Sequence, residues 1–198
     1  MPKRLQPALR YEDLAKAARR VIVRDGLGKA TVGRVALEAG CSPGLITYHA
    51  KTIDELLIAA ARYTAVTAIA KVDRLLEKYT GIEAIRRVAM ESIPLDKTRA
   101  DYRLLWISFW DLARSSKSVA KVLNEYLDRQ VRMYKALFLT AKKLGEIPAD
   151  VDVTEEVKSF IVLLDGIGIH GTLGRPRLPA RLQMAMVDEW IKNHLRPL

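Results

Sequence analysis

Apolar residues recur at helical spacing along most of the chain. Between residues 10 and 25 they fall on one face of a helix, which holds Leu14, Ala17, Ala18, Val21 and Ile22. The same period predicts later helices at 53–79, 82–92, 98–114, 117–144, 153–171 and 179–195. Helix-breaking residues separate them at Gly81, Pro94, Ser115-Ser116, 145–148 and 174–179. Because no alternating apolar and polar run indicates a strand, the pattern predicts an all-α fold.

Residues 31–52, TVGRVALEAGCSPGLITYHAKT, predict two short helices joined by a tight turn. The Thr31 hydroxyl stands before the first helix and can cap its free backbone amides. Gly40 ends that helix, because glycine accepts the left-handed conformation that such a stop requires. The apolar face of this helix consists of Val32, Val35, Ala36 and Ala39.

The second short helix runs from Pro43 to about Ala50. Ser42 can cap it, and Pro43 fits its first turn, where no backbone donor is lost. Gly44 allows a DNA backbone or base edge to come close. The stretch therefore predicts a helix-turn-helix. We expect a three-helix DNA-binding domain over residues 1–52 and a helical ligand-binding and dimerisation domain over residues 53–198, with about nine helices in all.

At these residues the chain resembles the TetR family of dimeric, ligand-released transcriptional repressors. The matching positions are Thr31, Val32, Val35, Ala36, Ala39, Gly40, Ser42, Gly44, His49 and Leu56. The chain departs from the family pattern with Cys41 for valine, Thr47 for tyrosine, Ala50 for phenylalanine and Ile53 for lysine. The family lysine meets a phosphate, so its loss removes one electrostatic contact, for which Arg34 or Lys51 can compensate.

The resemblance implies a homodimer that reads a palindromic operator in double-stranded DNA, with one recognition helix in each half-site. We expect base contacts from Pro43, Gly44, Leu45, Thr47 and Tyr48, and phosphate contacts from Thr31, Arg34, Ser42, His49 and Lys51. Leu45 and Thr47 suit a thymine methyl group. Since the departures weaken the match, the alternative is a basic helical sensor or scaffold without specific DNA recognition.

The charge of the chain favours a polyanionic partner. The net charge is +10 and the pI is near 9.8, which suits nucleic acid or an acidic membrane surface. Residues 1–52 hold four anions and ten cations, a net charge of +6. The cations are Lys3, Arg4, Arg10, Lys16, Arg19, Arg20, Arg24, Lys29, Arg34 and Lys51. Around a helix-turn-helix, this cluster favours contacts with phosphates over a merely solvated face.

The second part of the chain carries an aromatic stripe in the segment LLWISFWDLA, residues 104–113. Its members are Leu105, Trp106, Phe109, Trp110 and Ala113. Such a stripe is either ordinary core or the wall of a ligand pocket. Together with FIVLLDGIGI at residues 160–169, it resembles the ligand domain of the BetI-like subgroup, which includes choline-responsive repressors.

That resemblance implies a small-molecule inducer, and the sequence leaves its identity open between a cationic and an apolar compound. In a cation-sensing pocket, aromatic faces such as Trp106, Phe109 and Trp110 hold the ligand while a carboxylate balances its charge. The candidate carboxylates are Glu91, Asp111 and Asp165. Asp165 lies in an apolar run, and a hydrogen bond between helices explains its position equally well.

Two segments near the end of the chain predict a dimer interface. Small residues around Gly166, together with Ile169, allow two helices to approach closely. The last helix places Leu182, Ala185, Met186 and Trp190 on roughly one face. The resemblance places both helices in a four-helix interface. The alternative is that Met186 and Trp190 cover the chain's own core.

The run GIGIHG at residues 166–171 also matches the dinucleotide fingerprint G-x-G-x-x-G, with Asp188 or Glu189 near the position of a ribose-binding acid. The fingerprint requires a strand before it and a helix directly after it, and the predicted pattern offers neither. His170 lies about 140° around a helix from Asp165, so the two cannot easily act as a catalytic pair. These observations argue against a nucleotide-dependent enzyme.

Cys41 is the only cysteine, so no disulfide can form within the chain, which suits a reducing cytoplasm. No catalytic base stands beside it, and no residue spacing indicates a zinc site, so we expect no enzyme activity, cofactor or metal. The start MPKRLQPALR lacks a signal-peptide core, and no apolar run approaches the roughly 18 residues of a membrane span. We therefore expect a cytoplasmic protein that does not enter a membrane.

Overall fold

The computed structural model describes residues 11–174 and 178–195. Within these ranges all regular elements are helical: nine α-helices, a 3-10 helix and a π-helix. The predicted all-α fold is therefore confirmed. Three of the predicted cations, Lys3, Arg4 and Arg10, lie outside the described residues, as does part of the predicted break at 174–179.

The chain divides into two compact units. The first holds the residues up to Thr67 and also Ser108–Leu123, and the second holds Ala68–Ile107 and Asn124–Leu198. Three helices run from one unit into the other: α4 (Ile53–Leu76), α6 (Lys97–Ala113) and α7 (Lys117–Lys143). The functional boundary after residue 52 stays a prediction.

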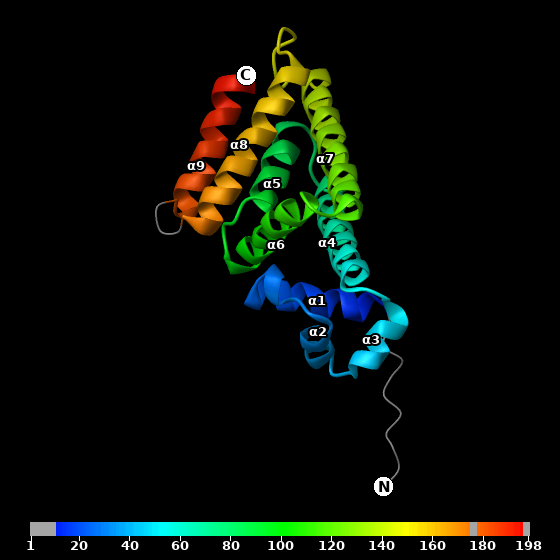
Figure 1. Cartoon of the computed structure of the whole chain (residues 1–198). Helices are drawn as coiled ribbons and strands as arrows, with labels where there is room; N and C mark the ends of the chain where they lie inside the picture. Colours follow the sequence, from blue (N-terminus) through cyan, green and yellow to red (C-terminus); the bar gives the residue numbers. More distant parts are fainter. Residues whose placement is uncertain (1–10, 175–177, 196–198) are drawn as a thin grey trace. The chain divides into compact units, whose positions relative to one another are not determined.

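In the first unit, three helices form a small bundle: α1 (Tyr11–Asp25), α2 (Val32–Ala39) and α3 (Pro43–His49) (Figure 1). The predicted face of α1 is buried, together with Val35 and Ala36 of α2 and Ile46 of α3. The 3-10 helix η1 (Leu27–Lys29) follows Gly26, whose φ of 87° turns the chain between α1 and α2. This bundle fixes the orientation of α3.

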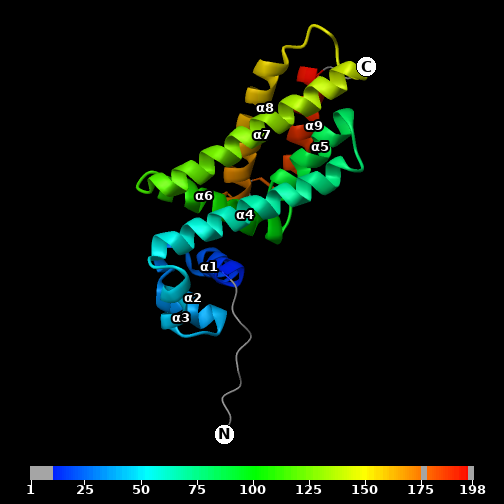
Figure 2. The same ribbon diagram turned by 90° about the vertical axis from the view of Figure 1, so that its right-hand side faces the viewer.

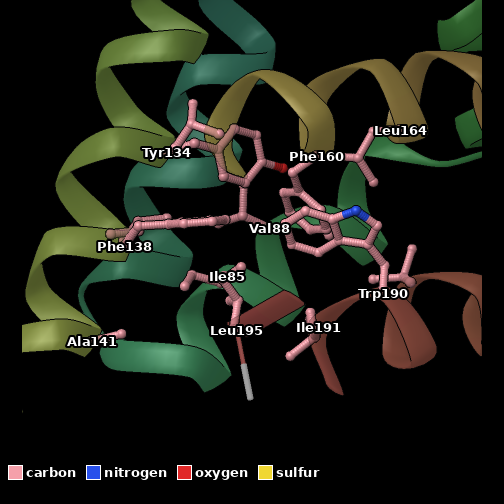
Figure 3. Close-up of a cluster of buried hydrophobic side chains, with 14 of the residues drawn as sticks. Ile85, Val88, Tyr134, Phe138, Ala141, Phe160, Leu164, Trp190, Ile191 and Leu195 are labelled. Atoms are coloured by element: carbon pink, nitrogen blue, oxygen red, sulfur yellow. The ribbon is translucent and has the colours of Figure 1, made fainter. Parts of the chain in front are cut away.

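In the second unit, α5 (Gly81–Ser92) and α9 (Ala180–Trp190) pack against α8 (Val153–Leu173) (Figures 1 and 2). Aromatic rings fill the core between these helices and α7, as Figure 3 shows. The ring centroids of Tyr134 and Phe160 are 5.4 Å apart, and those of Phe160 and Trp190 are 4.5 Å apart. Trp190 Nε1 donates a hydrogen bond to Ser159 Oγ at 3.2 Å, which satisfies the polar end of the indole.

Most helix ends lie within two residues of the prediction, and the exceptions are the ends of α4 and α9. α4 ends at Leu76, three residues early, and α5 begins at Gly81 itself, with a φ of 59° that suits glycine. The Ile82 amide donates to Glu146 Oε2 at 2.7 Å, which satisfies a backbone donor at the start of α5. After α9 the chain continues as a π-helical segment, η2 (Ile191–Leu195), which a period of 3.6 residues does not distinguish from an α-helix.

The glycine run at residues 166–171 lies inside α8 and not in a loop between a strand and a helix. A Cβ atom at Gly168 would collide with the guanidinium of Arg103, and one at Gly171 would lie 2.7 Å from Pro94 Cγ. Nothing lies within 4 Å of a Cβ built at Gly166. Two of the glycines therefore permit close packing within the unit, and the dinucleotide interpretation is rejected.

Candidate DNA-binding face and ligand cavity

The turn of the helix-turn-helix is set by local interactions. Thr31 Oγ1 accepts a hydrogen bond from the Arg34 amide at 3.4 Å, and Ser42 Oγ accepts one from the Leu45 amide at 3.3 Å. Gly40 adopts a φ of 66°, in the left-handed region, at the end of α2. Both predicted caps and the predicted glycine stop are confirmed. Each hydroxyl keeps its own proton, which can be donated to a phosphate.

One side of α3 anchors the helix and the other faces solvent. Ile46 is fully buried, Leu45 is half-buried, and Tyr48 is 81% exposed. Four more residues predicted to contact bases or phosphates are exposed as well: Ser42, Pro43, Gly44 and Thr47. The structure therefore gathers the predicted reading residues on one accessible face.

The hydroxyl of Thr47 points back to its own helix. Its Oγ1 donates to the Gly44 carbonyl at 3.0 Å, with the Pro43 carbonyl at 3.4 Å. A threonine bound in this way uses its hydroxyl on the backbone, so its methyl group remains for an apolar contact. Thr47 thus offers a methyl group to an approaching surface.

The next residues support the exposed phenol of Tyr48. The half-buried His49 ring packs edge-to-face against Tyr48, with centroids 5.2 Å apart. Ala50 is fully buried, and its amide donates to the Ile46 carbonyl at 2.7 Å. The alanine that replaces the family phenylalanine is therefore a packed residue at the end of α3.

Ion pairs hold several of the cations near the helix-turn-helix. Asp25 accepts from Arg34 Nη1 at 2.9 Å and from Arg24 Nη2 at 3.1 Å. Glu38 accepts from Arg20 and from Arg24, both at 2.6 Å. Hydrogen bonds from these guanidiniums lower the pKa of both carboxyls, so both stay ionised. Part of the local positive charge is therefore balanced within the unit.

Arg34 and Lys51 are the two candidates to replace the missing lysine. Arg34 is already paired with Asp25, whereas the described residues place no carboxylate within ion-pair distance of the exposed Lys51 ammonium. The Lys51 amide donates to Glu55 Oε2 at 2.8 Å, which fixes the backbone before α4. Lys51 is the better candidate for a phosphate contact.

The second unit contains a cavity of about 350 Å³. It lies along α4 and α7, and its lining residues are Ala68, Ile69, Val72, Asp73, Leu76, Ser92, Tyr126, Arg129, Gln130, Arg132 and Met133. None of these residues belongs to the predicted ligand site. One feature of the sequence could have pointed to this cavity, namely Arg129 and Arg132, which lie three positions apart on α7. The sequence does not show, however, that they lie near an apolar stretch of α4.

Two of the predicted ligand carboxylates already have cationic partners. Glu91 accepts from Lys71 Nζ at 2.9 Å and from Arg99 Nη2 at 3.0 Å. Asp165 accepts from Arg103 Nη1 at 3.0 Å, across α6 and α8. The hydrogen bond between helices that the sequence offered as an alternative for Asp165 is thus confirmed. Burial raises the pKa of the Asp165 carboxyl, and Arg103 offsets part of that rise.

The residues of the predicted aromatic wall are divided between the two units. Trp106 stacks on Tyr126 with ring centroids 4.1 Å apart, so these two rings cover each other's faces. Phe109, Trp110 and Asp111 belong to the first unit, where they are buried, half-buried and exposed respectively. The ring faces turned toward each other in the Trp106 stack leave no space for a cation between them.

The predicted interface residues fall into two groups. Gly166, Ile169 and Met186 are half-buried, and Leu182 and Ala185 are exposed. On α8, Val162 is 71% exposed and Leu173 is 62% exposed, which adds apolar surface that the prediction missed. Trp190 is only 8% exposed and lies in the chain's own core, and the half-buried Met186 packs against the same core, as the alternative prediction has it.

The remaining candidates carry little chemistry. Cys41 is half-buried, and burial raises the pKa of its thiol, which disfavours the reactive thiolate. Within residues 11–174 and 178–195, no three histidine, cysteine or acidic residues gather into a metal-binding group. The described helices include none with the length and apolar character to cross a membrane.

The capped pair of short helices with an exposed second helix defines a helix-turn-helix DNA-binding protein. Residues 14–60 match the family of bacterial regulatory proteins, tetR family, and residues 81–196 match the C-terminal domain of BetI-type transcriptional repressors. The chain belongs to the TetR family of transcriptional regulators and has the BetI-type C-terminal domain.

Proteins that are similar over nearly the whole chain support this family membership. The HTH-type transcriptional regulator PksA of Bacillus subtilis is 25% identical, across 100% of this chain and 94% of the relative. The regulator BetI of Rhizobium meliloti is 26% identical, across 99% and 94%. A putative regulator from Saccharomonospora viridis, solved in complex with choline, has the same fold, with a TM-score of 0.87, 21% identity and coverage of 93% and 96%.

Proposed function

We propose that this TetR-family regulator is a repressor that binds a palindromic operator as a homodimer and releases it when a small molecule occupies the cavity. The observation that carries the proposal is the exposed face of α3, where Tyr48, Thr47 and the Gly44 backbone are presented from a helix anchored by Ile46. Such a face suits the major groove. Lys51, Thr31 and Ser42 suit the flanking phosphates.

The release mechanism that we propose uses α4. This helix begins at Ile53, four residues after α3 ends, and its later residues Ala68–Leu76 include five that line the cavity. A ligand that binds one arrangement of α4 better than another shifts the population toward that arrangement. Binding in the cavity therefore changes how the two recognition helices fit their half-sites.

A dimer is required because a short recognition helix contacts few bases. The exposed apolar residues Val162, Leu173 and Leu182 support an interface that involves α8 and α9. The proposed activity is binding without catalysis, in the cytoplasm where the operator lies. The choline held by the Saccharomonospora protein is not carried over, because Glu91 and Asp165 are already paired with cations here.

Replacement of Tyr48 by alanine should test the reading face. We expect a loss of operator affinity of about tenfold or more, because a side chain that touches bases is removed from an exposed position. Fluorescence anisotropy on the protein's own upstream DNA and on scrambled DNA, across a salt series, measures this loss, with Leu139→Ala on α7 as a remote control. The unchanged protein should prefer the upstream DNA about a thousandfold.

If both DNAs bind equally and with steep salt dependence, the protein lacks specific recognition of that DNA. The basic sensor or scaffold that the departures from the family pattern allow would then replace the repressor proposal. If Tyr48→Ala binds like the unchanged protein, Tyr48 is not a reading residue.

Thymine in the half-site can be replaced by deoxyuridine, which lacks the methyl group. This replacement should weaken operator binding at the position where Thr47 contacts a base. Because the Thr47 hydroxyl is bound to the Gly44 carbonyl, we expect recognition through its methyl group, worth about fivefold in affinity for one buried methyl contact. The Thr47→Ser variant keeps the hydroxyl and loses the methyl, so it should bind more weakly and should not distinguish the two bases at that position. Equal discrimination by Thr47→Ser would refute methyl recognition by this residue.

A further inference from the structure

We infer that the cavity along α4 and α7 takes an amphiphilic anion, meaning a molecule with an apolar tail and a carboxylate-like head. This inference rests on the proposed function, because it names the chemical class of the inducer. It differs from both ligand classes that the sequence leaves open, a cationic compound and a purely apolar one.

The walls of the cavity suit an apolar tail. Five of the lining residues are aliphatic or methionine: Ala68, Ile69, Val72, Leu76 and Met133. All of them are buried or half-buried, so a tail that occupies the space between them is removed from water. Met133 adds a flexible side chain that adapts to tails of different shape.

Charged side chains also line the cavity, and they are predominantly cationic. Arg129, Arg132 and Asp73 are all exposed, which places their charged groups where the cavity meets solvent. Arg129 Nη2 and Asp73 Oδ1 are 3.6 Å apart, too far for a good hydrogen bond, so a ligand anion can compete for this guanidinium. In the described part of the chain, Arg132 has no carboxylate within ion-pair distance. The lining therefore has a net charge of +1.

A guanidinium presents several N–H donors in a plane, which match the two oxygens of a carboxylate. Gln130, next to Arg129 and half-buried, adds an amide that can donate to the same head group. The polar groups of the lining can thus hold an anionic head while the tail lies against Val72 and Met133.

A cationic head finds no comparable partner. Asp73 is the only carboxylate of the lining, and Arg129 faces it. The other candidate carboxylates of this unit, Glu91 and Asp165, are held by cations at 2.9–3.0 Å. Quaternary ammonium compounds are bound by cages of several aromatic faces, whereas the lining offers one aromatic ring, Tyr126, with one of its faces covered by Trp106.

Three probes with the same ten-carbon tail separate the possibilities: decanoate, decanol and decyltrimethylammonium, each kept below its critical micelle concentration. Isothermal titration calorimetry on the full-length protein, without DNA, measures their binding. We expect decanoate to bind about tenfold more tightly than decanol, and decyltrimethylammonium to bind most weakly. In high salt the advantage of decanoate should shrink while decanol binding stays nearly constant, because charges near solvent are screened.

The variant Arg129→Gln/Arg132→Gln should remove the preference for decanoate over decanol and leave decanol binding unchanged. The double variant Lys135→Gln/Lys143→Gln, at two exposed positions on α7 outside the lining, removes the same two positive charges and is the matched control. Tighter binding of decyltrimethylammonium, equal binding of all three probes, or no binding of any probe would each overturn the inference. So would a preference for decanoate that survives in the double variant.

Release of DNA by decanoate is measured separately by anisotropy, so the inference and the proposed function can fail independently. Decanoate binding without any operator binding would leave the ligand class standing and reject the repressor. Operator binding without decanoate binding would leave the repressor standing and reject the ligand class.

Discussion

Replacement of Val162 by aspartate is expected to convert the proposed dimer into a monomer and to lower operator affinity about a hundredfold or more. Val162 is 71% exposed on α8, the helix that also carries Gly166, Ile169 and the exposed Leu173. In an isologous dimer the substitution places two carboxylates in one apolar interface, where they are desolvated and unpaired. A monomer engages one half-site at a time and loses the gain in affinity that linked half-sites provide.

Analytical ultracentrifugation and operator binding measure the two effects. Val66→Asp is the matched control, because Val66 is 64% exposed on α4 and lies outside α8 and α9. Both variants should keep the helical circular dichroism of the unchanged protein. A dimeric Val162→Asp protein would show that the interface lies elsewhere, and a monomer with full operator affinity would reject the proposed dimeric reading of DNA.

Replacement of Arg103 by methionine is expected to reduce the free energy of unfolding by about 3 kcal/mol at neutral pH. Arg103 is 7% exposed and donates to Asp165 Oδ1 at 3.0 Å and to the Ser92 carbonyl at 2.7 Å. The close approach of α8 at Gly168 accommodates its guanidinium. Methionine fills a similar volume but leaves the Asp165 carboxylate in a poorly solvated place without its partner.

The loss of stability in Arg103→Met should be larger at neutral pH than at acidic pH. Burial raises the pKa of Asp165 in the folded protein, and removal of Arg103 raises it further. The folded variant then binds a proton more readily than the unfolded chain does. Its deficit relative to the unchanged protein is therefore largest at neutral pH and shrinks as the pH falls through the raised pKa.

Urea unfolding at several pH values measures this dependence. The double variant Arg103→Met/Asp165→Leu serves as the control, because it removes both polar partners and should recover most of the stability. A deficit that is the same at all pH values, or that is not relieved in the double variant, would show that Arg103 acts through packing and not through the charge of Asp165.

The helix-turn-helix could be predicted because its determinants are local. A hydroxyl three residues before an amide caps a helix wherever the pair occurs, as at Thr31 and Ser42. The left-handed turn at Gly40 likewise depends on the residue itself. The buried face of α1 follows from the helical period, and Ile46 is buried because the short helix α3 has to be anchored.

Local determinants do not predict the ligand site, because its residues meet partners that are distant in the sequence. Residue type makes Asp165 and Glu91 candidates, but Asp165 is held by Arg103, 62 positions earlier, and Glu91 by Lys71, 20 positions earlier. The helical period puts Trp190 on the same face as Leu182 and so predicts an interface position, whereas Trp190 packs on Phe160. A helical period shows that a face is apolar and does not show which surface covers it.

The sequence by itself determined the helices, the turn at Gly40 and the family, because caps, glycine stops and helical periodicity act between near neighbours. Only the tertiary structure decided which carboxylates are already paired, which aromatic residues are core, and where a cavity remains. Those features depend on side chains from distant helices that meet only when the chain is packed. The cationic and apolar lining of the cavity along α4 and α7 is one of them.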